Sequence, residues 1–112
     1  MLDQGDIVLV PVPFTDLSST RRRPVIVLSN ARYHQATEDM VVVAMTSNPF
    51  QTAYSFVLDD GDLDAGSLNH PGTVRADKIF TLSRQIIVKS FGRVKSPVLD
   101  RIRHLIADVI TP

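Results

Sequence analysis

Short apolar runs rich in β-branched residues are the feature that most constrains the fold of this chain. Such runs occupy residues 7–10, 24–28, 40–45, 54–58, 73–76, 79–82 and 86–91. Runs of this length, bounded by Gly, Pro, Asn, Asp and Ser, are typical of β-strands. The run at 40–45 contains no polar residue, which predicts a central strand buried on both faces. We therefore expect a compact barrel or coiled sheet.

The connections and the end of the chain complete this prediction. We expect a loop at 14–22, a helical turn at 31–36, an acidic turn at 59–64 and a loop at 66–72. Ser96 is a favourable N-cap, and Pro97 fits the first helical position. Apolar residues then recur at helical spacing up to residue 110, which predicts an amphipathic helix packed on the sheet or on a partner subunit. The expected class is mainly β with α.

Length and composition fit one globular domain over residues 1–112. The 44% apolar and 21% charged fractions are ordinary for folded domains and argue against disorder. No apolar run approaches the ~20 residues of a membrane-spanning helix, and no secretory signal is visible. The absence of cysteine excludes disulfides and cysteine nucleophiles and fits a reducing compartment. We expect a cytoplasmic location and no membrane association.

Charge is uneven along the chain, although the formal net charge is zero. Four acidic residues fall within positions 59–64, whereas residues 65–112 carry eight basic and three acidic residues, a net +5. Nine of the twelve cations are arginine, which suits bidentate phosphate binding and base stacking better than lysine does. A solvated surface of mixed charge would show the same pattern.

No metal site or cofactor is expected. The acidic residues at 59–64 do not follow the spacing of an EF-hand loop, and no glutamate closes that segment, which favours a solvated turn. The three histidines, His34, His70 and His104, are far apart and form none of the paired spacings that bind zinc.

Four segments, in this order, carry a resemblance to a known family. They are GDIVLV at 5–10, RPVIVLS at 23–29, VVVAMTS at 41–47 and VRADKIFTL at 74–82. Together they resemble the MazF/PemK toxins of bacterial toxin–antitoxin pairs, and the likeness extends from about residue 5 to residue 110. Each segment alone is a weak signal, and the shared order and spacing give the match its strength.

The resemblance implies an SH3-like barrel with short helices and a long C-terminal helix. It implies a sequence-specific, ribosome-independent endoribonuclease that needs no metal and cleaves single-stranded RNA, leaving a 2′,3′-cyclic phosphate and a 5′-hydroxyl. It also implies a homodimer and a cognate antitoxin that blocks the RNA groove.

The resemblance also implies particular site residues. Arg23 matches the family's active-site arginine and Thr46 its active-site threonine, while Arg75 and Asp77 match an Arg-x-Asp pair with catalytic roles in the PemK branch. Some family members carry a histidine in the loop after the first strand. Residues 14–22 contain none, so this chain departs from the family there.

The residue types agree with this chemistry but leave other interpretations open. Arg23 is suited to clamping phosphate oxygens and stabilising transition-state charge, and Thr46 to donating to phosphate or orienting the 2′-hydroxyl. An exposed basic turn and ordinary turn chemistry would explain the same residues. Arg75 and Asp77, two apart in a strand, share a face and would also form an ion pair. A free aspartate, with a pKa near ~3.9, is a poor base at neutral pH.

RNA binding is expected to involve further residues around this site. The candidates are Phe14, Arg22, Ser47, Asn48, Lys78 and Arg84. Phe14 would stack on a base, with packing in the core as the alternative, whereas Lys78 and Arg84 would contact the RNA backbone.

Two other functions remain open at this stage. One is a non-catalytic protein on the same barrel, either similar to the CcdB toxins, which inhibit DNA gyrase, or binding only an antitoxin. The other is an inactive relative of the nucleases. The residues at 23–24 and 46–47 favour the nuclease, because gyrase inhibition needs no phosphate-clamping arginine at that position.

Overall fold

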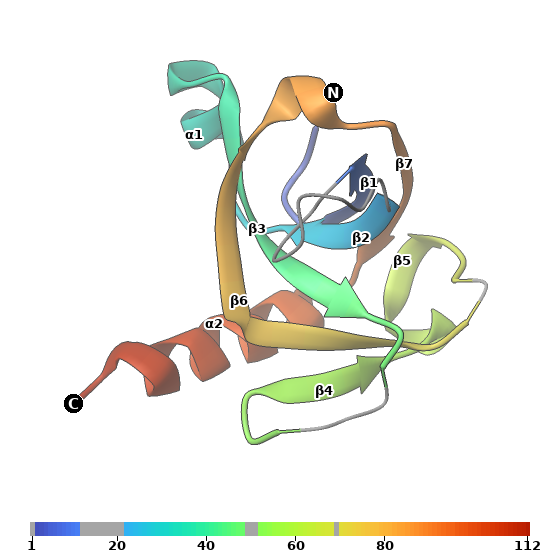
Figure 1. Ribbon diagram of the computed structural model, residues 1–112, viewed down its shortest axis with the longest axis vertical. Helices are drawn as coiled ribbons and strands as arrows, with labels where there is room; N and C mark the ends of the chain where they lie inside the picture. The colour runs from blue at the N-terminus through green and yellow to red at the C-terminus, as the bar shows by residue number, and fades with distance from the viewer. Residues whose placement is uncertain (1, 12–21, 49–51, 69) are drawn as a thin grey trace.

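The chain folds around one antiparallel sheet with a helix at its C-terminal end (Figure 1). The computed structural model describes residues 2–11, 22–48, 52–68 and 70–112. The strands are β1 (Asp6–Pro11), β2 (Arg22–Val27), β3 (Asp39–Thr46), β4 (Ser55–Leu58), β5 (Leu63–Gly66), β6 (Gly72–Ser83) and β7 (Lys89–Val94). The helices are α1 (Ala31–Ala36) and α2 (Ser96–Ile110), and two 3-10 turns are η1 (Asp60–Asp62) and η2 (Arg84–Ile86).

Strand order in the sheet is β4-β6-β3-β2-β1-β7-β5, with every neighbouring pair antiparallel. The sheet curls into a half-barrel, as Figure 1 shows. Strands β3, β2 and β1 occupy its centre, and the short strands β4 and β5 form its edges. The predicted class, a small β-barrel fold with a C-terminal helix, is confirmed.

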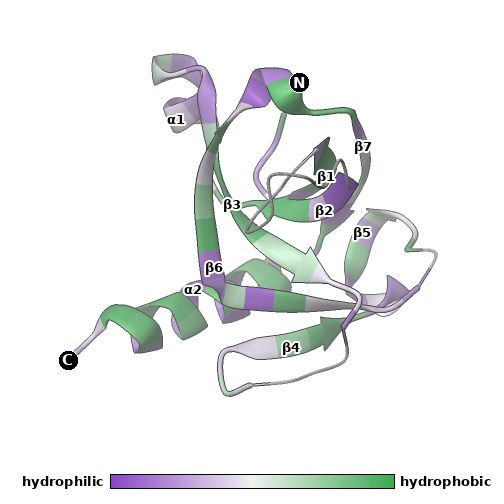
Figure 2. Cartoon of the chain, in the orientation of Figure 1, coloured by the Kyte–Doolittle hydropathy of each residue, from purple (hydrophilic) through white to green (hydrophobic). Residues whose placement is uncertain are grey.

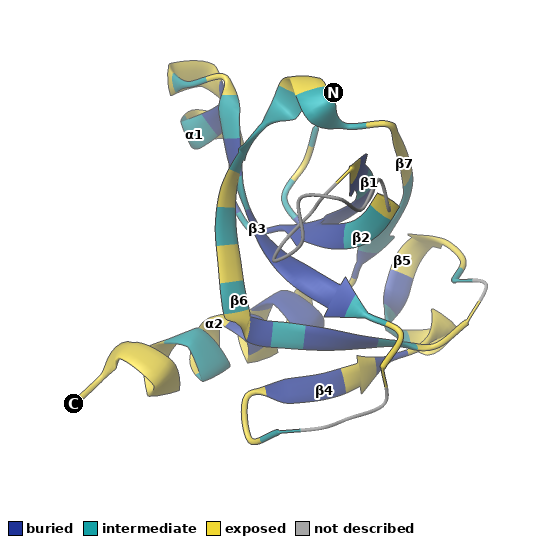
Figure 3. Cartoon of the chain, viewed as in Figure 1, coloured by how far each residue is buried: buried dark blue, intermediate teal, exposed yellow. Residues whose placement is uncertain are grey.

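Both faces of the central strands are buried, because apolar residues occupy the positions that point to one face of the sheet and also those that point to the other. On β3, Val43 and Met45 belong to one cluster, whereas Met40 and Val42 belong to another on the opposite face. Figure 3 shows burial along most of this strand. The prediction of a central strand at 40–45 buried on both faces is therefore confirmed, apart from the half-buried Val41.

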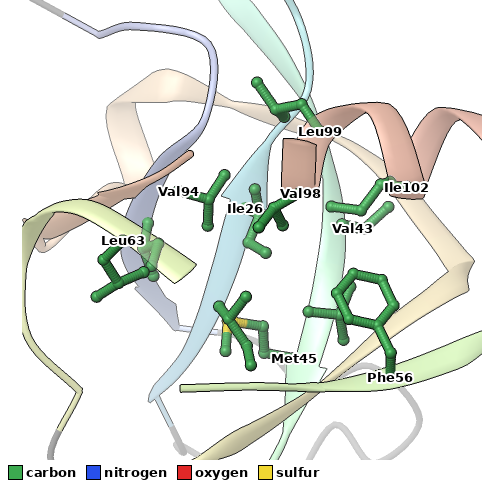
Figure 4. Close-up of a cluster of buried hydrophobic side chains, with 12 residues drawn as sticks. Ile26, Val43, Met45, Phe56, Leu63, Val94, Val98, Leu99 and Ile102 are labelled. Atoms are coloured by element: carbon green, nitrogen blue, oxygen red, sulfur yellow. The ribbon is translucent and has the colours of Figure 1, made fainter. Parts of the chain in front are cut away.

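Helix α2 covers the first of these clusters. Its first turns bury Val98, Leu99 and Ile102 in a cluster with residues from all seven strands, part of which Figure 4 shows. The cluster comprises Ile7, Ile26, Val43, Met45, Phe56, Leu58, Leu63, Val74, Val94, Val98, Leu99 and Ile102. The last turns remain apolar (Figure 2), yet Val109 and Ile110 are exposed where the helix extends past the sheet.

The N-terminus of α2 differs from the prediction by one residue. Lys95, not Ser96, is the N-cap, and no side chain caps the helix. One tertiary bond favours this start, because the Lys95 N–H donates to the Asp62 carbonyl at 2.8 Å. The Lys95 carbonyl then accepts the Val98 N–H at 3.0 Å within the first turn. Ser96 thus lies inside the first turn.

Strand β6 is continuous where the sequence predicts two pieces. Its pairing with β3 shifts between Val43, opposite Ile79, and Ala44, opposite Arg75, so that residues 76–78 are extra on the β6 side. Such a bulge bends a strand without ending it. Figure 1 shows β6 turning a corner, so that its first part pairs with β4 as well as β3, whereas its second part pairs with β3.

The acidic segment is only partly a turn. Residues 60–62 form η1, where Asp59 and Asp62 make a capping box, but Leu63 and Asp64 already belong to β5. The predicted strand at 86–91 is likewise displaced, because 84–86 form η2 and β7 covers Lys89–Val94. Pairing with β1 and β5 fixes β7 there.

Strand β5 depends on a glycine at its end. Gly66 has φ +78°, a left-handed conformation, and a Cβ there would collide with the Phe91 carbonyl oxygen. Only glycine fits this close approach of β5 to β7. The connector from residue 67 to β6 therefore starts from a fixed point beside β7.

Candidate functional site

A groove with a volume of about 330 Å³ lies at one end of the sheet, where β2 begins, β3 ends and β6 begins. The described residues lining it are Leu9, Arg22, Arg23, Pro24, Met45, Thr46, Ser47, Leu68, His70, Pro71, Gly72 and Phe91. Antiparallel pairing causes this convergence, since the start of each strand lies beside the end of its neighbour.

Arg22 and Arg23 bring positive charge to the groove from the first positions of β2. Pairing with Pro11 and Val10 of β1 holds their backbone in the sheet. The β2–β3 register runs from Val27 opposite Val42 to Val25 opposite Ala44, and Arg23 and Thr46, two positions farther along their strands, both line the groove. Within the described residues, no ion pair joins either guanidinium to a carboxylate. Both guanidiniums are suited to binding an anion.

Thr46 and Ser47 bring hydroxyl groups to the same groove from the end of β3. Thr46 pairs with Thr73 of β6 and is half-buried, and its Oγ1 accepts the Asn48 N–H at 3.1 Å. This local bond turns the chain away from the sheet. Asn48 is exposed beside the groove without being among its lining residues. Two guanidiniums and two hydroxyls form a donor set that suits a phosphate group.

Arg75 and Asp77 form an ion pair with each other. Arg75 donates through Nε to Asp77 Oδ1 at 3.0 Å and through Nη2 to Oδ2 at 2.8 Å. The hydrogen bonds from Arg75 lower the pKa of the Asp77 carboxyl, and the same contact raises the pKa of the Arg75 guanidinium. Neither residue lines the groove, although Arg75 lies two positions from Thr73 on β6. As held here, the carboxylate is a weak proton acceptor.

The remaining sequence-predicted residues divide between three places. Lys78 lies in the β6 bulge, half-buried and outside the groove. Arg84, at the opposite end of β3 from Thr46, donates through Nη2 to the carbonyls of His34 at 2.9 Å and Thr37 at 2.6 Å. Its guanidinium thus holds α1 against η2. Phe14 lies outside the described residues.

His70, which the sequence does not predict as a site residue, lines the groove together with Arg22, Arg23, Thr46 and Ser47. The three histidines were compared only for metal-binding spacing, and nothing local to residues 70–72 indicates where the loop lies. No cluster of three or more His, Cys, Asp or Glu side chains that would hold a metal is present within the described part of the chain. Among the same residues, no helix has the length and apolar character needed to cross a membrane.

The geometry defines a class of protein, a curled antiparallel half-barrel with a cationic, hydroxyl-lined groove at one sheet end. Residues 3–110 match the model of the PemK-like, MazF-like toxins of type II toxin–antitoxin systems. This match covers nearly the whole chain, so the protein belongs to that family. No curated protein matches the sequence.

Solved structures share the fold at low sequence identity. A MazF crystal structure from Deinococcus radiodurans is 24% identical, with a TM-score of 0.79, and the match covers 99% of this chain and 97% of that one. A MazE–MazF structure from the same organism is 22% identical, with a TM-score of 0.75 over 98% and 95% of the two chains. An endoribonuclease in complex with its cognate antitoxin from a mycobacterial species is 19% identical, with a TM-score of 0.75 over 100% and 98%.

Proposed function

We propose that this protein is an endoribonuclease toxin that cleaves single-stranded messenger RNA at a short sequence motif, independently of the ribosome. The observation that carries the proposal is the groove in which Arg22, Arg23, Thr46 and Ser47 converge. Membership of the toxin family and the fold shared with proteins named as endoribonucleases support it.

In the proposed reaction, the RNA 2′-oxygen attacks the neighbouring phosphorus while the bond to the 5′-oxygen breaks, giving a 2′,3′-cyclic phosphate and a 5′-hydroxyl. Arg23 holds two phosphate oxygens and stabilises the double negative charge of the phosphorane. Thr46 donates to a phosphate oxygen or orients the 2′-hydroxyl. The guanidinium charge takes the place of a metal ion in this scheme.

The other candidates have supporting roles in the proposal. Arg22, Ser47 and Asn48 bind RNA beside the scissile phosphate, and Lys78 contacts its backbone farther along β6. In the Arg75–Asp77 ion pair, Arg75 supplies positive charge near the RNA. Asp77 holds the Arg75 guanidinium in place on β6, the strand that also carries Thr73. Arg84 is not among the proposed RNA contacts, because its Nη2 already donates to two backbone carbonyls and its Nε is buried.

We propose three further properties with the activity. The protein forms a homodimer, supported by the exposed apolar residues Ile79 and Val88 and by Val109 and Ile110 of α2. A cognate antitoxin neutralises it by covering the groove, as complexes with antitoxins are known for proteins of the same fold. Its place of action is the cytoplasm, where messenger RNA is found.

The proposal is tested by incubating the purified protein with long single-stranded RNA in EDTA and with the same sequence carrying 2′-deoxy sugars. We expect cleavage of the first substrate only, and mapping of the new 5′ ends gives the motif. If the protein cleaves none of several long RNAs and inhibits gyrase, the nuclease proposal is wrong and the protein is a gyrase inhibitor similar to the CcdB toxins.

A further inference from the structure

Among the described residues that line the groove, none of those given a role above can remove the 2′-hydroxyl proton. No Asp or Glu is among the described residues that line it. Guanidiniums remain protonated in proteins, so Arg22 and Arg23 do not accept a proton. Asp77, the carboxylate that the family resemblance matched to a catalytic role, lies outside the groove, and both of its carboxylate oxygens are bonded to Arg75.

His70 has both the chemistry and the location that the step requires. His70 lines the groove with Arg23 and Thr46 and is an exposed residue, so a substrate in the groove would lie next to it. Imidazole is the side-chain type that exchanges a proton near neutral pH, which makes histidine the commonest general base in enzymes.

The connector that carries His70 is fixed at both ends. At one end, the Leu68 N–H donates to Asp60 Oδ1 at 2.7 Å. At the other, Gly72 pairs with Leu58 and packs so closely that a Cβ would lie 2.7 Å from Met45 Cε. Pro71 between them restricts the backbone further. His70 is therefore held beside the end of β3 that carries Thr46.

The charged groups around the imidazole come from two directions. Arg22 and Arg23 share the groove with it from β2. Asp59 and Asp60 line a neighbouring cleft that shares Leu68 and Pro71 with the groove. These four side chains are the titratable neighbours, among the described residues, that a pH profile has to take into account.

We propose that His70 is the general base of the cleavage reaction, an inference that rests on the proposed nuclease function. The neutral imidazole accepts the 2′-hydroxyl proton as the bond from the 2′-oxygen to phosphorus forms and the bond from phosphorus to the 5′-oxygen breaks. The departing 5′-oxygen takes a proton from water, and the imidazolium then returns its proton to solvent. The step has no net proton change and needs no other reactant.

The test compares His70→Gln and His70→Ala with the matched control His104→Gln, since His104 is exposed on α2 outside the groove. Single-turnover cleavage of a mapped RNA is measured from pH 5 to 9 under saturating protein. Binding of a non-cleavable 2′-deoxy oligonucleotide is measured in parallel, and circular dichroism checks folding. We expect both His70 variants to lose roughly 10²–10⁴-fold in rate, with binding changed less than about threefold.

The pH dependence separates a base from a structural residue. The wild-type rate should rise with pH, because only the unprotonated base accepts a proton, and this rise should disappear in His70→Gln. Free imidazole added to His70→Ala should restore part of the rate, whereas it should not affect Arg23→Ala.

Three results would overturn the assignment. A His70→Gln rate and pH profile equal to those of the wild type would remove His70 from the chemistry while leaving the nuclease function intact. Loss of oligonucleotide binding with an unchanged rate at saturation would make it a binding residue only. Absence of RNA cleavage by the wild-type protein would instead refute the proposed function, and the assignment with it.

Discussion

Two arginines at opposite ends of β3 show how tertiary structure decides what a charge is available to do. Both were candidates for contacting RNA. Arg23 lies beside the end of β3 in an open groove, without a described carboxylate partner. Arg84, beside the start of β3, donates hydrogen bonds to the carbonyls of His34 and Thr37 at the end of α1. The first guanidinium is available to a ligand, and the second acts as a crosslink within the fold.

Arg23→Ala gives the largest expected effect on activity. Removing the guanidinium that we propose to stabilise the phosphorane should lower the cleavage rate by roughly 10²–10³-fold, as for the loss of one transition-state donor. The midpoint of urea unfolding should stay near that of the wild type, because Arg23 makes no described ion pair. Arg32→Ala, at an exposed position on α1, is the matched control and should leave cleavage unchanged. If Arg23→Ala lost stability and kept its activity, Arg23 would be a structural residue, and the contrast with Arg84 would be wrong.

Arg84→Ala should have the opposite signature. Two backbone carbonyls lose a charged donor, and we expect a decrease of about 2–3 kcal/mol in the free energy of unfolding, measured by urea denaturation. Cleavage per folded molecule should change less than about threefold. If cleavage fell as it does in Arg23→Ala with stability intact, Arg84 would belong to the RNA-binding surface after all.

Thr46→Val sharpens the comparison within the groove. It keeps the shape and β-propensity of the side chain but removes the hydroxyl. We expect cleavage to fall by about tenfold, the equivalent of one neutral hydrogen bond, with RNA binding nearly unchanged. Thr73→Val, at the paired position on β6, is the control, and an equal loss there would attribute the effect to the strand pair instead of the hydroxyl.

The smallest expected effect is a pH dependence of stability that arises from His34, which lies near Arg84. Burial, and then the Arg84 charge, lower the pKa of His34, whose Nε2 lies 2.7 Å from Ser29 Oγ. A histidine with a lowered pKa in the folded state binds fewer protons there than when unfolded. Its contribution to stability is complete above the ordinary value of 6.5 and is lost as pH falls below it.

The melting temperature should therefore decrease between pH 7 and pH 5. In His34→Gln the decrease should be smaller over this interval. In Arg84→Ala it should be intermediate, because one of the two causes is removed. A melting temperature with the same pH dependence in all three proteins would exclude His34 as its source.

The sequence predicted the elements whose signals are local. The valine-rich run of β3, the turn at α1 and the apolar periodicity of α2 were all placed within a few residues of their observed bounds. Errors occurred where distant contacts decide. The bulge that makes β6 continuous exists only relative to β3, and the Lys95 cap depends on its bond to Asp62.

The candidate site was predictable to a similar degree. Arg23 and Thr46 came from the resemblance, and the structure brings both to one groove. His70 was not found, because the groove is reached through a connector whose path is set by Asp60 and by the packing of Gly72. The engagement of Arg84 was equally hidden, since its partners lie about fifty positions away in the chain.

Met45 belongs to the helix-covered cluster and also lines the groove. At this end of the sheet, the same side chain therefore packs in the hydrophobic core and lines the groove, and no layer of residues separates the two. Substitutions that reshape the interior near Met45 will reshape what the groove accommodates. In a lineage under pressure to alter its target, such interior positions offer a route to new specificity without any exposed residue being exchanged.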